Sequence, residues 1–529
     1  MATTTQTVKT IENSAGIPSI AEFYAGRSIF ITGATGFMGK VLMEKLLRSC
    51  PDVVCIYILI RPKKGLDPRQ RLENLLSSRL FDQLRQEQPL FAEKIQPVPG
   101  DILQPNMGLS EADEELLISE VSIVFHSAAT VRFDEPMKIS IDMNVTATQR
   151  VIDLTKKFTK LASFLHTSTA YANCDQTEIS ESVYTPPIHP QKLIDAVEWM
   201  DEDVLNALTP KMLINRPNTY TYTKSLAEFL IAEQCKQIPT AIFRPSIVGA
   251  SWKDPIPGWV DNYNGPTGII AAMGKGILRT MVGCRDETAD LIPVDTAVNM
   301  MIAIGWHTGV YRPEVMKVYH GTTGQINRLK WGQIEKQILR VFEHHPVDGM
   351  IRVPNASFTC SRLWHEIRVR FDHMVPAYMM DLFLWITGRK PIFVKVQDKL
   401  CKSMNSLAYF TSHGWTFSND NMFMLLDVMT DTDKQVFDFD VSKIDWMKYI
   451  ETYCLGTKEF VLKEDPNKTN LARMALKRMQ RINTFLNCVT VFVVWRLLMT
   501  RVKIASTVWY RLVNIIMKLY NQIPKIFLS

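Results

Sequence analysis

The chain has 529 residues, 46% hydrophobic and 22% charged, which is typical of a folded protein that is too long for a single hydrophobic core. A formal net charge of +6 is small for this length and no basic stripe interleaves with aromatic residues, so nucleic acid is not expected as a partner. The nine cysteines are scattered without a Cys-x-x-Cys pair, so we expect no disulfide framework and no metal site.

The N-terminal segment, residues 1–20, is rich in Thr and Ser and lacks the apolar stretch of a secretory signal peptide. We expect it to be flexible. The candidate cofactor-binding and catalytic residues are expected after this segment, where apolar strands begin to alternate with helical patterns.

A short buried strand is predicted at Ser28–Thr32, and a glycine-rich turn and a helical pattern follow it directly. This order of elements is typical of a dinucleotide site. Gly33 is expected to make the tight turn, Gly36 to let the backbone approach the pyrophosphate, and Gly39 to let the helix pack on the strand. The phosphates are expected at the helix N-terminus. The predicted cofactor contacts in this segment are Thr32, Gly33, Thr35, Gly36, Phe37, Met38 and Gly39.

The second predicted strand, Val53–Ile60, ends in the basic sequence Arg61-Pro62-Lys63-Lys64. An NAD site usually has an acidic residue about 20 residues beyond the glycines, where it binds the ribose diol. Because cations stand there instead, we predict that Arg61 binds a 2′-phosphate and that the cofactor is NADPH. A solvated basic loop is the alternative interpretation.

Two further apolar strands end in residues suited to a cofactor crevice. Ile95–Pro99 leads to Asp101, which is predicted to meet the adenine. Val121–Phe125 leads to Ala128, whose small side chain leaves room for the nicotinamide ribose. His126 and His166 have no metal-ligand neighbour at a usual spacing and are interpreted as structural.

A third strand, Ser163–His166, leads to the hydroxyl residues Thr167 and Ser168. Side chains at the carboxyl end of a parallel strand face the ligand crevice. Ser168 is the predicted hydrogen-bond donor to a substrate carbonyl and Thr167 is its close rival, while a simple strand-end cap is the alternative for either.

Tyr220 and Lys224 stand four residues apart and therefore on one face of a predicted helix. A neighbouring cation favours the phenolate, so we expect the pKa of Tyr220 to lie below its ordinary value of about 10. Such a tyrosine can exchange a proton near neutral pH. Together with the glycine segment, the pair predicts a nicotinamide-dependent oxidoreductase that acts on a carbonyl or an alcohol.

The alternation of strands and helices up to Gly249 predicts an α/β fold, a doubly wound parallel sheet of the Rossmann type. We assign residues 21–355 to this reductase domain. Long loops without structure of their own are usually functional, so the Pro-, Gly- and Trp-rich segment 250–280 is expected to cover the substrate, unless it only connects domains. Asp295 is predicted to cap the N-terminus of a later helix.

Residues 356–465 are predicted to form a separate helical domain, because they are rich in aromatic, Met and basic residues in helical patterns. Within it, Met374–Thr387 is strongly apolar but holds Pro376 and Asp381, and it is too short to span a bilayer. We predict a buried core helix there, with a membrane-surface or acyl-lining role as the alternative.

Residues 466–529 form a basic, hydrophobic tail that we predict to be a membrane anchor. The apolar run Phe485–Met499 reaches the roughly 20 residues of a span only if it extends to Ile482 and Val502 and its arginines reach the interface. A transmembrane helix is slightly favoured over a helix on the surface, and amphipathic helices docked on the protein are the alternative.

Five segments together resemble the fatty acyl-CoA reductases, which belong to the extended short-chain dehydrogenase/reductase superfamily. They are Thr32–Gly39, His126–Phe133, Thr167–Asn173, Tyr220–Lys224 and Arg244–Trp252. The similarity covers the chain apart from its first residues and is strongest to the vertebrate enzymes of peroxisomes, which hold the membrane by their C-terminus.

The resemblance implies that NADPH reduces a long-chain acyl-CoA to the primary alcohol through an aldehyde, with release of CoA. It implies Tyr220 as general acid, Lys224 as the residue that tunes it and anchors the ribose, and Ser168 or Thr167 as the carbonyl-orienting hydroxyl. Asn144 matches a superfamily position that supports the geometry of the active site and completes the predicted cofactor set.

The same resemblance implies a peroxisomal membrane location with the catalytic domain in the cytosol, and the endoplasmic reticulum is the alternative. The chain ends in Ile-Phe-Leu-Ser instead of Ser-Lys-Leu, so this placement depends on the tail. A homo-oligomer remains open. The competing functions are a sterol or sugar-nucleotide dehydrogenase or epimerase on the same scaffold, and a catalytically silent NADP-binding membrane scaffold.

Overall fold

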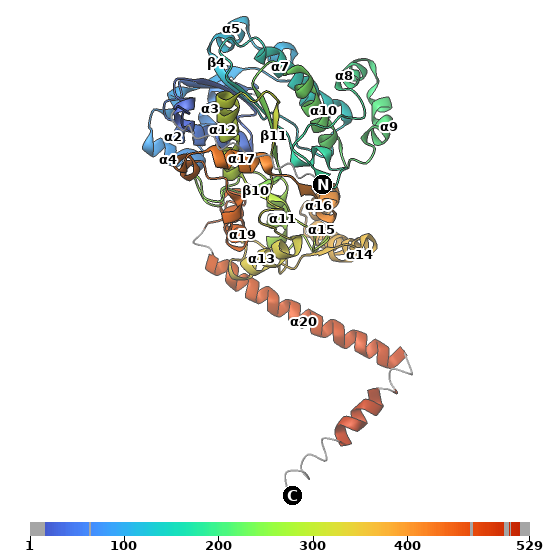
Figure 1. Ribbon diagram of the computed structural model, residues 1–529. Coiled ribbons are helices and arrows are strands. Elements are labelled where there is room, and N and C mark those ends of the chain that lie inside the picture. Colours follow the sequence, from blue (N-terminus) through green and yellow to red (C-terminus); the bar gives the residue numbers. More distant parts are fainter. Residues whose placement is uncertain (1–15, 63–64, 466–468, 502–506, 508, 519–529) are drawn as a thin grey trace, which may run out of the picture.

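The computed structural model describes residues 16–62, 65–465, 469–501, 507 and 509–518; Lys63, Lys64 and most of the predicted flexible N-terminus lie outside this set. A parallel sheet forms its centre (Figure 1). The strands of this sheet are β1 (Ser28–Thr32), β2 (Cys55–Ile60), β3 (Ile95–Pro99), β4 (Val121–His126), β5 (Ser163–Thr167), β7 (Thr240–Pro245) and β11 (Lys317–Gly321). Their order, β11-β7-β5-β4-β1-β2-β3, is that of a doubly wound fold, so the predicted Rossmann architecture is confirmed.

Helices cover both faces of the sheet. α2 (Phe37–Ser49) packs on α12 (Val294–Tyr311) over one face, and α7 (Ala147–Thr155) and α10 (Thr219–Gln234) cover the other. Successive residues of β1 point into these two cores, Ile29 into the first and Phe30 into the second. Burial on both faces explains why the strands read as continuous apolar runs.

The strand order reverses beside β1, which pairs with β2 on one side and β4 on the other. Thr32 of β1 lies opposite His126 of β4, and His126 lies opposite His166 of β5. The carboxyl ends of these three strands therefore meet at one edge, where ligands bind in sheets of this kind. This edge positions the candidate site.

The remaining elements of the sheet-containing part are short helices and strands that connect or cover it. They are α1 (Ile20–Tyr24), α3 (Pro68–Leu76), α4 (Asp82–Glu87), α5 (Glu111–Glu120), α6 (Met137–Ile141), α8 (Pro190–Trp199), α9 (Glu202–Leu213), β8 (Ile247–Gly249), α11 (Pro266–Gly274), β10 (Leu291–Pro293) and α13 (Trp331–His344). β8 pairs with β10, so the long loop after β8 begins beside the N-terminus of α12.

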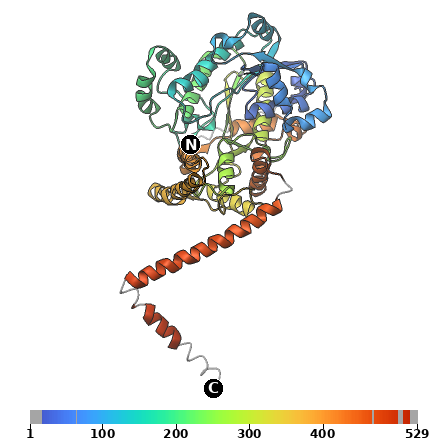
Figure 2. The same ribbon diagram turned by 180° about the vertical axis from the view of Figure 1, so that it is seen from behind.

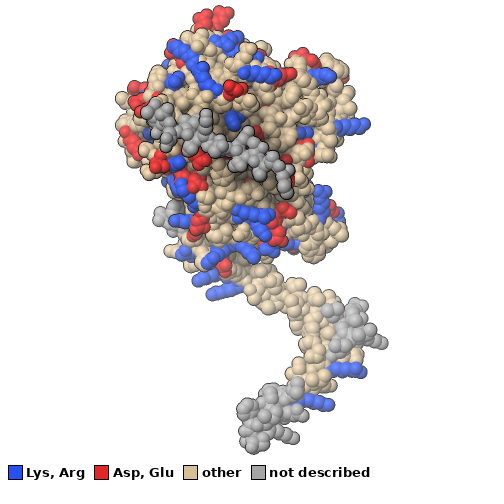
Figure 3. Space-filling view, in the orientation of Figure 1, with Lys and Arg blue, Asp and Glu red and all other residues tan. Residues whose placement is uncertain are grey.

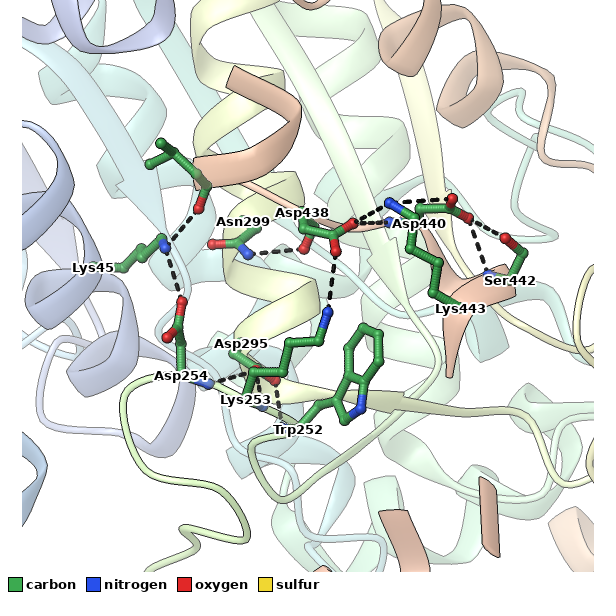
Figure 4. A network of polar contacts seen from close by, with 11 residues as sticks. Lys45, Trp252, Lys253, Asp254, Asp295, Asn299, Asp438, Asp440, Ser442 and Lys443 are labelled. Carbon is green, nitrogen blue, oxygen red and sulfur yellow. Dashed lines mark hydrogen bonds and ion pairs between the residues drawn. The ribbon is translucent and has the colours of Figure 1, made fainter. Parts of the chain in front are cut away.

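Asp295 holds that loop instead of capping α12, whose N-cap residue is Pro293. The buried carboxylate of Asp295 accepts hydrogen bonds from the backbone N–H groups of Trp252, Lys253 and Asp254 at 2.8–3.0 Å. Lys45 of α2 donates to Asp254 at 3.1 Å, and Figure 4 shows these contacts as one network that includes Asp438. The predicted cap is wrong because three loop amides outcompete the helix terminus for the same oxygens.

The C-terminal segment is largely helical, as predicted, but two of its strands pair with strands of the preceding part. β12 (Ser357–Thr359) pairs with β9 (Thr280–Val282), and β13 (Thr416–Phe417) with β6 (Glu178–Ile179). Its helices are α14 (Arg362–Arg368), α15 (Val375–Ile386), α16 (Phe393–Ser412), α17 (Asp420–Val428), α18 (Asp431–Val436) and α19 (Trp446–Gly456). The domain boundary at residue 356 stays a prediction.

The apolar segment predicted as a buried core helix is a helix, α15, but it is not buried. Met379, Phe383 and Trp385 are 66–68% exposed, whereas Asp381 faces inward and accepts the amides at the start of α16. The prediction is wrong because this helix turns its polar residue toward the protein and its apolar residues toward solvent.

The tail begins as one long helix, α20 (Thr469–Arg501), which projects from the body in both ribbon views (Figures 1 and 2). Several basic side chains lie near the end of the body from which it leaves, with acidic side chains among them (Figure 3). Among the described residues, none belongs to a helix that combines the length and apolarity needed to cross a membrane. The part of the tail beyond Arg501 lies mostly outside the described residues.

Candidate active site

A cavity of about 430 Å³ lies at the carboxyl ends of β1, β4 and β5. It brings together the glycine segment, the hydroxyl residues after β5 and the Tyr–Lys pair, which are far apart in the sequence. The predicted residues that line it are Gly33, Gly36, Phe37, Met38, Gly39, Thr167, Ser168, Tyr220 and Lys224. Most of the predicted site residues therefore line one continuous cavity.

The glycine segment fits a dinucleotide. Gly33 has φ +79°, and a Cβ there would lie 2.7 Å from the backbone nitrogen of Ala128. A Cβ on Gly39 would lie 2.4 Å from the carbonyl oxygen of Gly33, so the helix packs directly on the turn. Gly36 is the exposed N-cap of α2 and leaves the first N–H groups of that helix open to a phosphate. Thr35 is partly exposed in the same turn.

Thr32 does not line the cavity; its hydroxyl lies 2.7 Å from Nδ1 of His126. Nε2 of His126 lies 3.0 Å from the hydroxyl of Thr148, so both ring nitrogens have partners. Burial lowers the pKa of His126 to about 3, and nearby Lys224 adds to this effect. A neutral, hydrogen-bonded His126 agrees with the structural role predicted for it, while a cofactor contact of Thr32 stays a prediction.

Arg61 and Asp101 stand at the ends of β2 and β3, outside the cavity. The side chain of Arg61 is 64% exposed, and its Nη1 lies 3.8 Å from Oδ2 of Asp101. Such an exposed pair is weakly held and can be rearranged by a ligand. The structure thus places both residues at the sheet edge where the distal part of a dinucleotide would lie.

Tyr220 stands in the first turn of α10, where Asn218 caps the helix by accepting from the N–H of Thr221 at 2.9 Å. Burial raises the pKa of Tyr220 to about 12, and a hydrogen bond with Thr169 opposes the rise. The predicted lowering of this pKa is wrong, since desolvation of the buried phenol outweighs the one hydrogen bond that favours the phenolate. Tyr220 therefore holds its proton at neutral pH, as a general acid must.

Lys224 is buried one turn further along α10. Its Nζ donates a hydrogen bond to the carbonyl oxygen of Thr167 at 2.8 Å, which fixes the ammonium beside the cavity. Burial lowers the pKa of Lys224 to about 8, and Glu228 on the next turn opposes this shift.

The rival hydroxyls differ in their partners. Thr167 Oγ1 lies 2.9 Å from the hydroxyl of Ser127. Ser168 Oγ is buried and has no hydrogen-bond partner within the described part of the chain. Since buried polar atoms are normally satisfied, Ser168 is the hydroxyl that remains available to a substrate carbonyl.

Asn144 lies behind the cavity in a short π-helical turn, Asp142–Thr146. Its Oδ1 accepts from the N–H of Thr130 at 3.0 Å, and its Nδ2 donates to the hydroxyl of Thr223 at 2.9 Å. The amide thus ties the segment after β4 to the helix that carries Tyr220. This agrees with the predicted supporting role, while a direct cofactor contact stays a prediction.

The rest of the cavity is mostly apolar, and sequence reasoning missed much of it. Val131 and Phe133 stand within the segment after β4, and the ring of Phe133 lies 5.7 Å from that of Tyr220. Phe410 comes from α16 and packs on Phe133 at 5.3 Å. The long loop after β8 contributes Asn262, Asn264 and Gly265 to the lining, while its predicted role of covering the substrate stays a prediction.

Fold and site define a class: a Rossmann-type oxidoreductase with a dinucleotide turn and a Tyr–Lys pair. Two family models, both described as male sterility protein, match residues 31–301 and 372–464. "Fatty acyl-CoA reductase 1" of Xenopus laevis and of Homo sapiens are each 45% identical over 94% of this chain and 97% of their own length. "Fatty acyl-CoA reductase 2" of Mus musculus is 43% identical, over 94% and 96%. The chain belongs to the fatty acyl-CoA reductase family.

Solved structures share the fold at low identity. The terminal R domain from the myxalamid PKS-NRPS biosynthetic pathway has a TM-score of 0.53 and 19% identity over 82% of this chain and 90% of its own. The reductase domain of a nonribosomal peptide synthetase from Mycobacterium tuberculosis reaches 0.54 at 18% identity, over 83% and 92%. These similarities extend beyond the sheet to most of the chain.

Proposed function

We propose that this protein reduces long-chain fatty acyl-CoA to the primary alcohol with NADPH, releasing CoA and passing through the aldehyde. The observation that carries the proposal is the shared cavity, in which a dinucleotide turn, an acid–lysine pair and an apolar wall face one another. An apolar wall suits an acyl chain, whereas a sugar nucleotide would need many polar partners.

The residues of the chain have separable tasks in this reaction. When bound, the reduced nicotinamide supplies hydride to the carbonyl carbon of the thioester and, in a second round, to that of the aldehyde. Ser168 donates a hydrogen bond to the carbonyl oxygen and orients it. Tyr220 donates the proton that this oxygen takes up when the alcohol forms, and the thiolate of CoA leaves after the first reduction. Lys224 favours the phenolate that remains.

The test is product analysis with palmitoyl-CoA and NADPH on the detergent-solubilised chain. Hexadecanol with two NADPH oxidised for each acyl group supports the proposal. An aldehyde that never proceeds to alcohol would limit the function to one reduction. No nicotinamide oxidation with any acyl-CoA of a chain-length series would favour the silent scaffold instead.

The choice of NADPH over NADH depends on Arg61, whose exposed guanidinium stands at the end of β2. Arg61→Ala should weaken NADPH binding about tenfold or more while changing NADH binding little, because a charge-assisted bond to phosphate is lost. Fluorescence titration with both nucleotides measures this. Equal loss for both would contradict the assignment.

The membrane part of the proposal is that the C-terminal tail anchors the protein, on a peroxisomal membrane with the catalytic part in the cytosol. The long projecting helix α20, with exposed apolar side chains such as Phe485 and Phe492, supports it. Removal of the chain from residue 469 onward should shift the protein toward the soluble fraction, and imaging beside a peroxisomal and a reticular marker decides the organelle. Self-association would appear in light scattering of the detergent complex.

A further inference from the structure

The helical run from residue 362 to 386 is amphipathic, but its apolar face points to solvent and its polar face to the protein. α14, the π-helical turn Val369–Met374 and α15 follow one another without a break. Large apolar side chains recur at every fourth position on its outer face and are 37–70% exposed. These residues are Leu363, Ile367, Phe371, Val375, Met379 and Phe383.

The inner face of the same run carries polar groups. His373 accepts a hydrogen bond from the N–H of Arg279 at 3.0 Å, and His365 lies 3.3 Å from the hydroxyl of Thr280. Asp381 accepts the N–H groups of Ile392 and Phe393 at 2.8 Å. The protein thus uses the polar side of the run for packing and leaves the apolar side without a partner in the described chain, which is the reverse of a helix in a soluble core.

The rim of this apolar face is basic. Between residues 362 and 395 the chain has six Lys and Arg but only three Asp and Glu. Asp381 is buried and Asp372 pairs with Arg368, so one exposed acid, Glu366, remains. Within the described chain, no carboxylate pairs with the exposed cations Arg362, Arg370, Arg389, Lys390 and Lys395.

The apolar face lies at the end of the body where the tail begins. Both ribbon views show α20 leaving from the end formed by α13, α14 and α15, opposite α5 and α7 (Figures 1 and 2). Arg473 in the first turns of α20 donates to the carbonyl oxygen of His344, at the end of α13, at 3.0 Å. The neighbouring tail residues Lys477, Arg478 and Arg481 are exposed cations as well.

We propose that the run 362–386 is a second membrane-docking surface, which lies in the headgroup region of an anionic bilayer. Apolar side chains of this size, with Trp364, Tyr378 and Trp385 among them, match the interfacial region, and the cations match anionic headgroups. A protein partner or a second copy would be expected to pair the five cations with acids. The cations in the first turns of α20 also extend the same positive charge toward the tail. The inference does not depend on the proposed reductase activity.

Photo-crosslinking of the full chain tests the contact directly. p-Benzoyl-phenylalanine replaces Phe383, which is 66% exposed, in one variant. In a matched control it replaces Trp199, which is 74% exposed at the end of α8, a helix at the other end of the body (Figure 1). Each variant is bound to vesicles of phosphatidylcholine with phosphatidylserine and illuminated. Phospholipid adducts at position 383 and none at 199 are expected. Protein–protein adducts at 383, or no adduct there, would overturn the proposal.

Vesicle flotation of a charge variant gives the energetic test. Met379→Glu/Phe383→Glu should lower the apparent affinity of the full chain at least about tenfold, since two large apolar contacts are lost. Trp199→Glu/Ile214→Glu is the control, and equal losses in both variants would overturn the proposal. Turnover of palmitoyl-CoA in detergent micelles should be the same in all of these variants, so a failed proposed function is detected separately.

Arg389→Glu/Lys390→Glu tests the electrostatic part. Each cation near an anionic surface contributes about 1 kcal/mol, so this variant should lose about fivefold for each cation removed on phosphatidylserine-containing vesicles. On pure phosphatidylcholine it should bind like the unchanged protein. A loss of the same size on both vesicles would contradict an anionic bilayer as the occupant.

Discussion

Glu228→Gln probes a buried ion pair that links the stability of the fold to the catalytic lysine. Glu228 and Arg244 have side chains that are 1% and 0% exposed. Their contact is bidentate, with Nε to Oε1 at 2.8 Å and Nη2 to Oε2 at 2.7 Å. The guanidinium also donates to the carbonyl oxygens of Ser180 and Ser182 at 3.0 and 2.8 Å.

The magnitude follows from what the substitution leaves behind. Gln keeps the shape but removes the charge, so the buried guanidinium of Arg244 loses the carboxylate to which it is hydrogen-bonded. Breaking a buried pair from one side is expected to cost about 3–5 kcal/mol of unfolding free energy, whereas replacing both partners by apolar residues is often close to neutral. Glu228→Leu/Arg244→Met should therefore be more stable than Glu228→Gln alone.

Urea unfolding followed by tryptophan fluorescence, with all variants under one condition, measures the difference. The same substitution has a kinetic consequence, because Glu228 opposes the lowering of the Lys224 pKa. Without it, that pKa should fall further below about 8, and the alkaline decline of kcat/KM should move to lower pH. A loss under about 1 kcal/mol for Glu228→Gln, or a double variant that is the less stable one, would refute the reasoning.

Three further outcomes are expected from the site itself. Tyr220→Phe should reduce kcat by about 10²–10⁴-fold while NADPH binding by fluorescence titration stays within about twofold, because the hydroxyl acts in proton transfer; wild-type turnover would show that another group is the acid. Ser168→Ala should lower kcat/KM about 10- to 100-fold and Thr167→Val less, since only the former hydroxyl is unpartnered; the reverse order would exchange their roles. In a pH series, kcat/KM should decline above about pH 8 as Lys224 loses its proton. The contribution of Lys224 to the free energy of unfolding should rise between about pH 8 and 10.5, because its pKa is lower in the folded state than in the unfolded state. A profile of kcat/KM that stays flat to about pH 10 would contradict the need for the ammonium.

The sheet and the polar part of the site could be predicted because their signals are local. The strands Ser28–Thr32 and Ile95–Pro99 have the bounds that the sequence indicated, and the glycine turn follows the first of them as expected. Tyr220 and Lys224 are separated by one helical turn, so their common face follows from spacing alone. Ser168 was distinguished from Thr167 only by the structure, because the bond between Thr167 and Ser127 joins two different strand ends.

The errors arose where tertiary contacts decide. Asp295 has the sequence signature of a cap, but its oxygens are taken by a loop some 40 residues earlier in the chain. The apolar composition of Met374–Thr387 indicated burial, and only the packing of Asp381 against α16 shows that this helix is turned outward. Phe410 carried no local signal, since its place in the cavity depends on how α16 returns to the sheet.

The packing of the segment after α16 against the sheet-containing part has a consequence for how the protein is synthesised. The N–H of Glu181 donates a hydrogen bond to the hydroxyl of Ser418, which is 237 residues later in the chain. The N–H of Asn421 donates to the carboxylate of Glu181, 240 residues earlier. A ribosome adding about 5–20 residues per second needs tens of seconds to cover that separation. During biosynthesis the nascent Rossmann unit therefore emerges before the segment that completes the wall of its cavity, and the site cannot be complete until that segment has been made.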